Sequence, residues 1–341
     1  MIATAIVLIV IAICAALFYL KGSLFMSLAT VFTAIIANIV AFAYFEQLAA
    51  IFISRKIGGL SFAAYWQSIS FALIFIIAFA ALQTAVLSLI KKSVKFDSLA
   101  EKIGRSVFGV IAGLFLSGAL LTALGLAPVK NNIPYERFRP AAPQPASPTK
   151  ALLNADGLAA GIFSVTSSGS LSGSARFAAI HPDFLNEIYL NRITSDKNIS
   201  LVTVSNVIEI PKKASAWPAP ADLKTSDDTV ISPEAGKEFY IVRVEIKTAA
   251  GDFTPAQLRL ICGEKDAEPM KGSAVVEYPV GYLLKSGNVK QTDLANKITL
   301  KKTKTYDWLF NVPSGHVPVL ATFKQNSIAP VTKIVETPPV E

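Results

Sequence analysis

The chain has 341 residues, of which 52% are hydrophobic and 16% are charged, and its formal net charge is +8. Lys and Arg outnumber Asp and Glu by five in residues 1–127 and by three in the remainder, and the long apolar runs lie in the first part. Basic residues beside apolar runs favour anionic lipid headgroups. We therefore expect a lipid bilayer as a partner and no nucleic acid.

The cysteines and histidines are too sparse for metal or disulfide chemistry. Cys14 lies inside an apolar run and Cys262 lies far along the chain, so a disulfide between them is not expected. His181 and His316 stand next to or near prolines, outside any Cys/His cluster, and are predicted to be loop residues. The sequence predicts neither a metal site nor a bound cofactor.

Two transmembrane spans are predicted at the start of the chain. Residues 1–20 carry no charge and match the roughly 20 helical residues that a bilayer core requires. This run lacks a basic n-region and a small-residue cleavage site, so we expect a retained helix rather than a signal peptide. Lys21-Gly22-Ser23 breaks the helix, and residues 24–45 form the second span. Asn38 inside it is expected to form a hydrogen bond between helices.

A third span is predicted at residues 66–90, after a connecting segment at residues 46–61. The connecting segment is too short and too polar to span the bilayer and suits an amphipathic helix in the membrane interface; a simple connector, or a re-entrant segment, is the alternative. Gln67 and Gln83 are the amides of the third span and are expected to tie helices together.

The fourth span is predicted at residues 104–127 and carries small residues at every fourth position, namely Gly109, Gly113 and Ser117. Small residues at this spacing allow another helix backbone to approach closely. We expect this face to pack against a helix of this chain, against a second copy, or against another membrane or envelope protein.

Basic residues in the short loops predict the orientation. The loop before the fourth span is the most basic, and it contains Lys91, Lys92, Lys95, Lys102 and Arg105. Because Lys- and Arg-rich short loops stay in the cytoplasm, this loop and the Lys21 turn should be cytoplasmic. Both chain termini are then expected outside the cytoplasm, in the periplasm or at the cell exterior, which indicates a multi-pass membrane protein.

The rest of the chain is predicted to be extracytoplasmic. Residues 128–150 contain six prolines and should be an extended, semi-rigid linker. Residues 151–198 should connect this linker to a β domain and include a short helix after Pro182, and residues 331–341 form a tail. Alternating strand patterns predict an antiparallel all-β sandwich at residues 199–330, with strands in residues 201–210, 238–248, 257–263, 305–313 and 317–324. Trp308 and Phe310 should share the core-facing side with Tyr306.

Three groups of residues in the first 192 positions resemble the colicin V production (CvpA) family of four-span inner-membrane proteins. They are YLKGSL at 19–24, KIGRSVFGVIAG at 102–113, and the segments at 154–158, 169–172, 183–185 and 191–192. The resemblance implies a location in the bacterial inner membrane, a role in toxin production or export (the toxin biosynthetic process), and a role in upkeep of the cell envelope. Residues 236–244 and 308–313 are similar to immunoglobulin-like extracytoplasmic modules. The expected fold is thus a four-span α-helical membrane bundle followed by a C-terminal immunoglobulin-like β-sandwich.

Three functional hypotheses remain open from the sequence. The first is a non-enzymatic envelope protein that acts as a scaffold or recruits partners, since the spans lack ionisable residues near their centres. The alternative is a transporter or channel subunit that uses Asn38, Gln67 and Gln83. The third is an extracytoplasmic enzyme, but Gly169-Ser170-Leu171-Ser172-Gly173 has leucine where a nucleophile elbow requires serine, and no catalytic residue is predicted.

Overall fold

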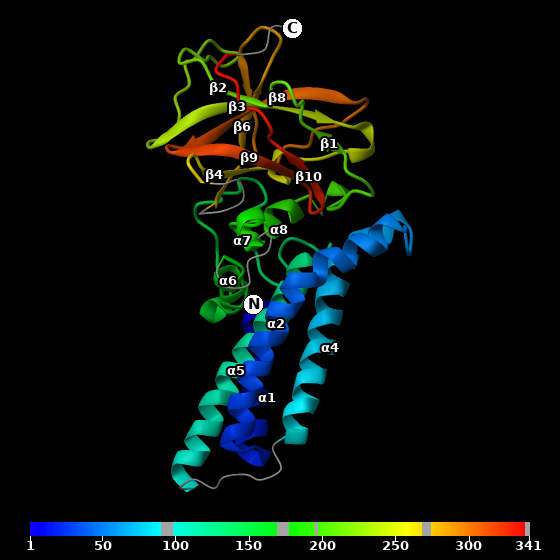
Figure 1. Cartoon of the computed structure of the whole chain (residues 1–341), viewed down its shortest axis with the longest axis vertical. Coiled ribbons are helices and arrows are strands. Elements are labelled where there is room, and N and C mark those ends of the chain that lie inside the picture. The colour runs from blue at the N-terminus through cyan, green and yellow to red at the C-terminus, as the bar shows by residue number, and fades with distance from the viewer. Residues whose placement is uncertain (90–97, 169–176, 195–196, 268–273, 338–341) are drawn as a thin grey trace. The chain divides into compact units, whose positions relative to one another are not determined.

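The computed structural model describes residues 1–89, 98–168, 177–194, 197–267 and 274–337. The chain forms two compact units (Figure 1). The first, the helical unit, contains Met1–Arg137 and Ser147–Val165. The second, the β unit, contains Phe138–Ala146 and Thr166–Glu341.

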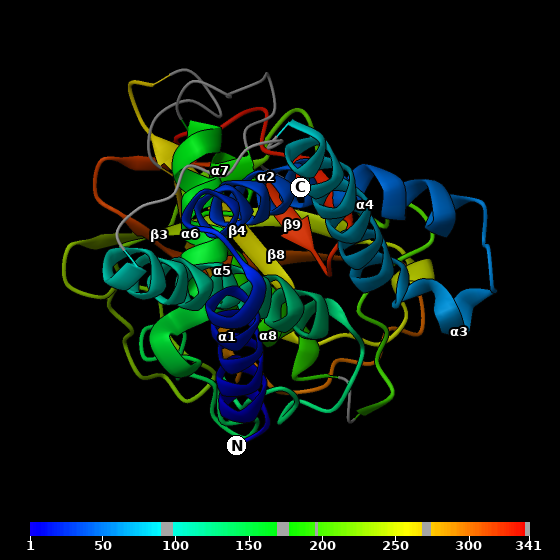
Figure 2. The same cartoon turned by 90° about the horizontal axis from the view of Figure 1, so that it is seen from below.

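The helical unit is built on long apolar helices. They are α1 (Ile2–Lys21), α2 (Leu24–Ser54), α4 (Trp66–Leu89) and α5 (Ser98–Leu126), with the single turn α3 (Leu60–Ala63) between α2 and α4. α5 contacts α1, α2 and α4, and α2 also contacts α4 (Figure 2). The chain then enters α6 (Ala155–Ser168), which begins in this unit.

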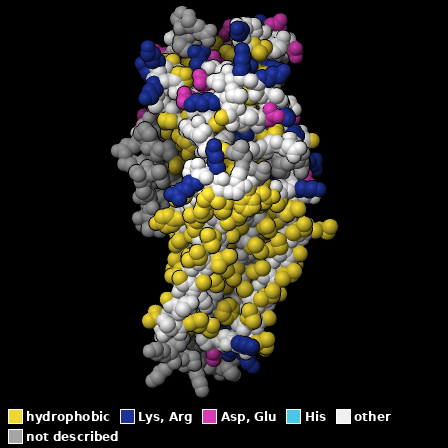
Figure 3. Space-filling model, turned by 90° about the vertical axis from the view of Figure 1, so that its right-hand side faces the viewer, with side chains coloured by type: hydrophobic (Ala, Val, Ile, Leu, Met, Phe, Trp, Pro, Cys, Tyr) yellow, Lys and Arg dark blue, Asp and Glu magenta, His cyan; other side chains and the backbone are white. Residues whose placement is uncertain are grey.

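Four helices are long and apolar enough to cross a membrane, as the sequence predicts. Many of their large hydrophobic side chains are exposed, and Figure 3 shows them as a continuous band over the helices. A surface of this kind is stable against lipid and costly against water. The helical unit therefore fits a membrane protein.

The predicted boundary between the second span and the connecting segment was wrong. α2 continues without interruption through Glu46 to Ser54, so residues 46–54 extend the second helix and form no separate interfacial element. The chain reverses only at Gly58 and Gly59, whose φ angles are +75° and +77°, a conformation that glycine adopts without strain.

The proline-rich stretch 128–150 is also not the extended linker that was predicted. Tyr135 is buried, and the Pro134 carbonyl accepts a hydrogen bond from the Ala3 amide at 3.0 Å. The Thr149 amide donates to the Arg137 carbonyl at 2.9 Å. These contacts return the chain to the helical unit, because the exposed backbone groups of a proline-rich segment find partners there.

The β unit contains two antiparallel sheets. The larger has the strand order β1–β3–β8–β6–β7, with β2 also paired to β3, and the smaller has the order β10–β9–β4–β5. The strands are β1 (Ile208–Glu209), β2 (Ala216–Pro218), β3 (Lys237–Ile246), β4 (Leu258–Glu264), β5 (Ala274–Glu277), β6 (Pro279–Leu283), β7 (Val289–Gln291), β8 (Lys304–Pro313), β9 (His316–Phe323) and β10 (Ser327–Pro330). Two short helices, α7 (Phe177–Ile180) and α8 (Phe184–Arg192), precede the strands.

The core of the β unit draws side chains from both sheets. Trp308 on β8 is fully buried and belongs to the same hydrophobic cluster as Leu260 on β4 and Phe323 on β9. Tyr306 and Phe310 are also buried in this cluster, which confirms the predicted inward side of β8. Alternate residues of a strand share a face, so this spacing could be read from the sequence.

The predicted strand at residues 201–210 was largely wrong, since only Ile208 and Glu209 pair in a sheet. The side chain of Asn326 replaces a neighbouring strand at Thr203. Its amide oxygen accepts from the Thr203 amide at 2.8 Å, and its amide nitrogen donates to the Thr203 carbonyl at 2.6 Å. A side chain thus satisfies backbone groups that a sheet partner would otherwise occupy.

Candidate functional site

The predicted helix-packing face on α5 contacts α1 of the same chain. A Cβ atom at Gly113 would lie 2.7 Å from the Ile11 Cα, and one at Gly109 would lie 2.9 Å from the Ala15 Cα. Ser117, also buried, donates its hydroxyl to the Leu114 carbonyl at 2.9 Å. A partner helix on this face would therefore have to displace α1.

The basic loop is only partly described. Lys91, Lys92 and Lys95 lie outside the described residues, and Lys102 is exposed. Arg105 donates to the Gly22 carbonyl at 2.6 Å and lies 3.6 Å from the Glu101 carboxylate. This contact places the first hairpin turn and the start of α5 at the same end of the helical unit.

The predicted intramembrane polar residues have different surroundings. Gln83 on α4 accepts from Thr33 and donates to Thr30, both at 3.1 Å and both on α2. Asn38 instead donates to the Ala34 carbonyl of its own helix at 2.9 Å, so the predicted bond between helices was wrong for this residue. Gln67 is buried within α4. Gln83 therefore connects two helices, whereas Asn38 bonds within its own helix.

A buried charged cluster in the β unit was missed by sequence reasoning. The His181 Nδ1 lies 2.8 Å from the Glu187 Oε2, and both side chains are at most 8% exposed. Arg259 on β4 donates to the Glu187 carbonyl at 3.4 Å and to the Thr322 hydroxyl at 2.9 Å. His181 lies in a loop between α7 and α8, as predicted, and its ring is buried. His316 instead begins strand β9. We call His181, Glu187 and Arg259 the buried charged cluster.

Electrostatics keep Glu187 ionised. Burial alone raises the pKa of its carboxyl, but the charges of His181 and Arg259, with the hydrogen bond from His181, outweigh this effect and lower the pKa below the usual value. The charges of Arg259 and Glu187 also act on Tyr278, and burial raises the pKa of its hydroxyl well above the usual value. A cluster without solvent access can orient α8 on the sheet, but it offers no surface to a substrate.

Polar contacts fix the rest of α8, all of whose residues are buried. Asp183 caps its first turn by accepting from the Asn186 amide, and the Asn186 side chain donates to the Pro145 carbonyl at 3.1 Å. Near the other end, Asn191 accepts from Gln257 at 2.7 Å and donates to the Leu201 carbonyl at 3.1 Å. The predicted short helix after Pro182 is thus confirmed and is held at both ends.

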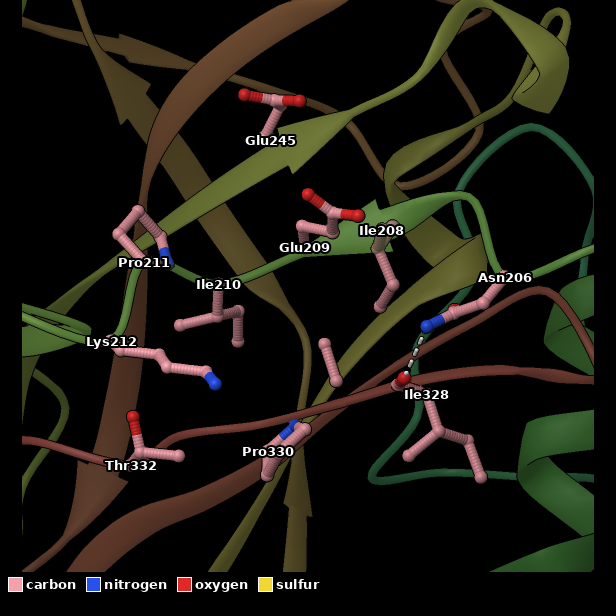
Figure 4. A pocket seen from close by; sticks show the side chains of 11 residues that line it. Asn206, Ile208, Glu209, Ile210, Pro211, Lys212, Glu245, Ile328, Pro330 and Thr332 are labelled. Carbon is pink, nitrogen blue, oxygen red and sulfur yellow. Dashed lines mark hydrogen bonds between the residues drawn. The ribbon is translucent and has the colours of Figure 1, made fainter.

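The β unit also has an accessible groove between its two sheet edges. It encloses about 610 Å³, and its lining residues are Asn206, Ile208, Glu209, Ile210, Pro211, Lys212, Glu245, Ile328, Ala329, Pro330 and Thr332 (Figure 4). Asn206 crosses the groove and donates to the Ile328 carbonyl at 3.0 Å. Glu209 forms an ion pair with Lys247. An exposed strand edge flanked by apolar and charged side chains can bind a partner segment. The lining residues do not include a nucleophile paired with a base, which proton or acyl transfer would require.

The described part of the chain contains no group of three or more His, Cys, Asp or Glu residues that could bind a metal ion. Cys14 and Cys262 are both free thiols, as predicted, and both are buried. Burial raises the pKa of the Cys262 thiol, so it is poorly suited to act as a nucleophile.

The two units define a class of protein that combines four apolar helices fit for a membrane with a region of antiparallel β-sheet. No protein-family model, no curated protein and no solved structure matches this chain.

Proposed function

We propose that this protein is a non-enzymatic integral protein of the bacterial inner membrane, whose helical bundle anchors an extracytoplasmic β unit and recruits partners in the cell envelope. The observation that carries the proposal is the use of intramembrane polar groups for packing. Gln83 is bonded to Thr30 and Thr33, and the Ser68 hydroxyl on α4 donates to the Ala123 carbonyl on α5 at 2.7 Å. Side chains engaged in this way hold helices together.

The finer parts of the proposal concern the β unit and the biological role. Two antiparallel sheets around one core support an immunoglobulin-like sandwich as the fold. The groove beside β1 and β10 is the accessible surface that we propose for recruitment, since α1 covers the glycine face of α5. A role in colicin V production or envelope maintenance rests only on the residues that resemble that family.

The scaffold proposal predicts that Gln83→Ala lowers stability without affecting solute permeability. Loss of the hydrogen bonds to α2 should cost about 0.5–1.5 kcal/mol of unfolding free energy, measured by denaturation in detergent micelles. Thr84→Ala is the matched control, because the Thr84 hydroxyl bonds only to its own helix at Ala80 and is exposed. Vesicles containing the protein should retain entrapped ions and small solutes as well as protein-free vesicles do. A solute flux that Gln83→Ala or Asn38→Ala abolishes, in a folded protein, would establish the transporter alternative instead.

The proposed orientation predicts that alkaline phosphatase fused after Glu341 is active, because that reporter folds only where its disulfides form. A β-galactosidase fusion at the same position should be inactive. A stable but inactive phosphatase fusion, together with an active β-galactosidase fusion, would place the β unit in the cytoplasm.

A further inference from the structure

Helix α6 carries exposed apolar residues on one side. Leu158, Gly161 and Val165 recur at helical spacing and are exposed, with Val165 at 73%. A Cβ atom at Gly161 would have no neighbour within 4 Å. Up to Val165, α6 contains Asp156 as its single charged residue, and Asp156 is fully buried. The exposed surface of this segment is therefore apolar, although the sequence places it beyond the last predicted span.

The opposite face of α6 packs on the membrane helices below their ends. A Cβ atom at Gly118 of α5 would collide with the Ala155 carbonyl and would lie 3.1 Å from the Ala159 Cβ. Gly118 precedes the end of α5 at Leu126 by eight residues, which corresponds to about 12 Å along the helix. The start of α6 thus lies at a level where α5 is still an apolar span.

Further contacts along α6 agree with this depth. Phe163 stacks on Phe42 of α2, with ring centroids 5.3 Å apart and planes inclined by 13°. Ile162 packs against the hydrophobic cluster that contains Phe115 of α5. Leu120, two residues beyond Gly118 on α5, is 43% exposed and belongs to the hydrophobic band of the bundle. Helix α6 therefore packs against the sides of α2 and α5, and α5 itself exposes apolar side chains such as Leu120.

A buried polar contact fixes the first turn of α6. The Tyr135 hydroxyl donates to the Asp156 Oδ2 at 2.6 Å, and Arg137 donates to the Tyr135 hydroxyl at 3.1 Å. These residues satisfy the carboxylate without water, which allows the helix start to sit among apolar helices.

We propose that α6 is a fifth membrane element, which lies in the outer leaflet and exposes Leu158, Gly161 and Val165 to lipid acyl chains. Its 14 residues are too few to cross the bilayer. A short helix can lie within one leaflet when its backbone groups bond within the helix and its other face packs on protein. The inference rests on the proposed insertion of the bundle in a membrane.

The test uses nitroxide spin labels on the full chain in lipid vesicles. Leu158→Cys and Val165→Cys carry the labels under test, and the two native thiols are buried. Leu120→Cys is the control for the lipid-facing bundle, and Val230→Cys, at an exposed site of the β unit, is the control for water. Collision rates are measured with oxygen, which concentrates in lipid, and with a water-soluble nickel chelate.

Labels at Leu158 and Val165 should collide with oxygen as often as the Leu120 label, and with nickel about tenfold less often than the Val230 label. Nickel collision equal to that of the Val230 label would place α6 in water and overturn the inference. Protection from both reagents would show that the β unit, a second copy or another protein covers the face, and would also overturn it. Frequent nickel collisions at the Leu120 label would instead refute membrane insertion of the bundle. This result distinguishes failure of the proposed function from failure of the inference about α6.

Discussion

Gly113→Ala should destabilise the helical unit by about 1–3 kcal/mol, although alanine is the better helix former by about 1 kcal/mol. The added methyl group would lie 2.7 Å from the Ile11 Cα and 3.2 Å from the Val10 carbonyl oxygen. Both atoms belong to the backbone of α1, which cannot move aside as a flexible side chain would. The helices must separate, and the contacts between α1 and α5 are weakened.

Gly161→Ala is the matched control, since it makes the same substitution in a helix where the methyl group meets nothing within 4 Å. It should stabilise the protein by roughly 0.5–1 kcal/mol through helix propensity alone. Unfolding in detergent micelles, followed by circular dichroism, measures both variants. Equal shifts for the two variants would show that the approach of α1 to Gly113 contributes nothing to stability.

Glu187→Gln should destabilise the β unit by about 3–5 kcal/mol, the cost of removing one partner from a buried ion pair. The glutamine keeps the size of the side chain but leaves the charges of His181 and Arg259 without their carboxylate. Glu209→Gln is the matched control, because Glu209 pairs with Lys247 at a site where its side chain is 61% exposed. The loss there should be below about 1 kcal/mol.

The pH dependence of unfolding provides a second measurement on the same pair. The folded state lowers the Glu187 pKa below its ordinary value of 4.5. The stabilising contribution is therefore complete above about pH 4.5 and is lost as the pH falls through the folded-state pKa. Asp183 and Tyr278 also interact electrostatically within this region, so the comparison with Glu187→Gln isolates the carboxyl. Urea unfolding from pH 3 to pH 7 should show a smaller pH slope for the variant, and an unchanged slope would contradict the assignment.

Neither the groove nor the buried charged cluster could be predicted from the sequence. His181 and Glu187 are six residues apart, and Arg259 is 72 residues beyond Glu187. No periodic pattern connects them. The groove combines residues near β1 with residues near β10, which are more than one hundred positions apart. The cluster depends on the packing of α8 against β4, and the groove depends on the proximity of β1 and β10, so neither has a local signal.

The sequence by itself determined the elements whose stability is local. Long uncharged runs predicted the four apolar helices, because a membrane span depends on the length and hydrophobicity of a single segment. Regular alternation predicted the long strands β3 and β8 and the inward side of Trp308. Likewise, the four-residue spacing of Gly109 and Gly113 marked a surface for close helix approach, and the sequence left the packing partner open.

Only the tertiary structure decided which segments meet. It assigned α1 to the glycine face of α5, returned Tyr135 and Thr149 to the helical unit, and placed α6 beside Gly118. It also formed short strands such as β7 and β10, each too brief to show a pattern of its own. The physical reason is the same throughout: these contacts bury surfaces or pair backbone groups from distant parts of the chain, and their free energy exists only when both sides are present.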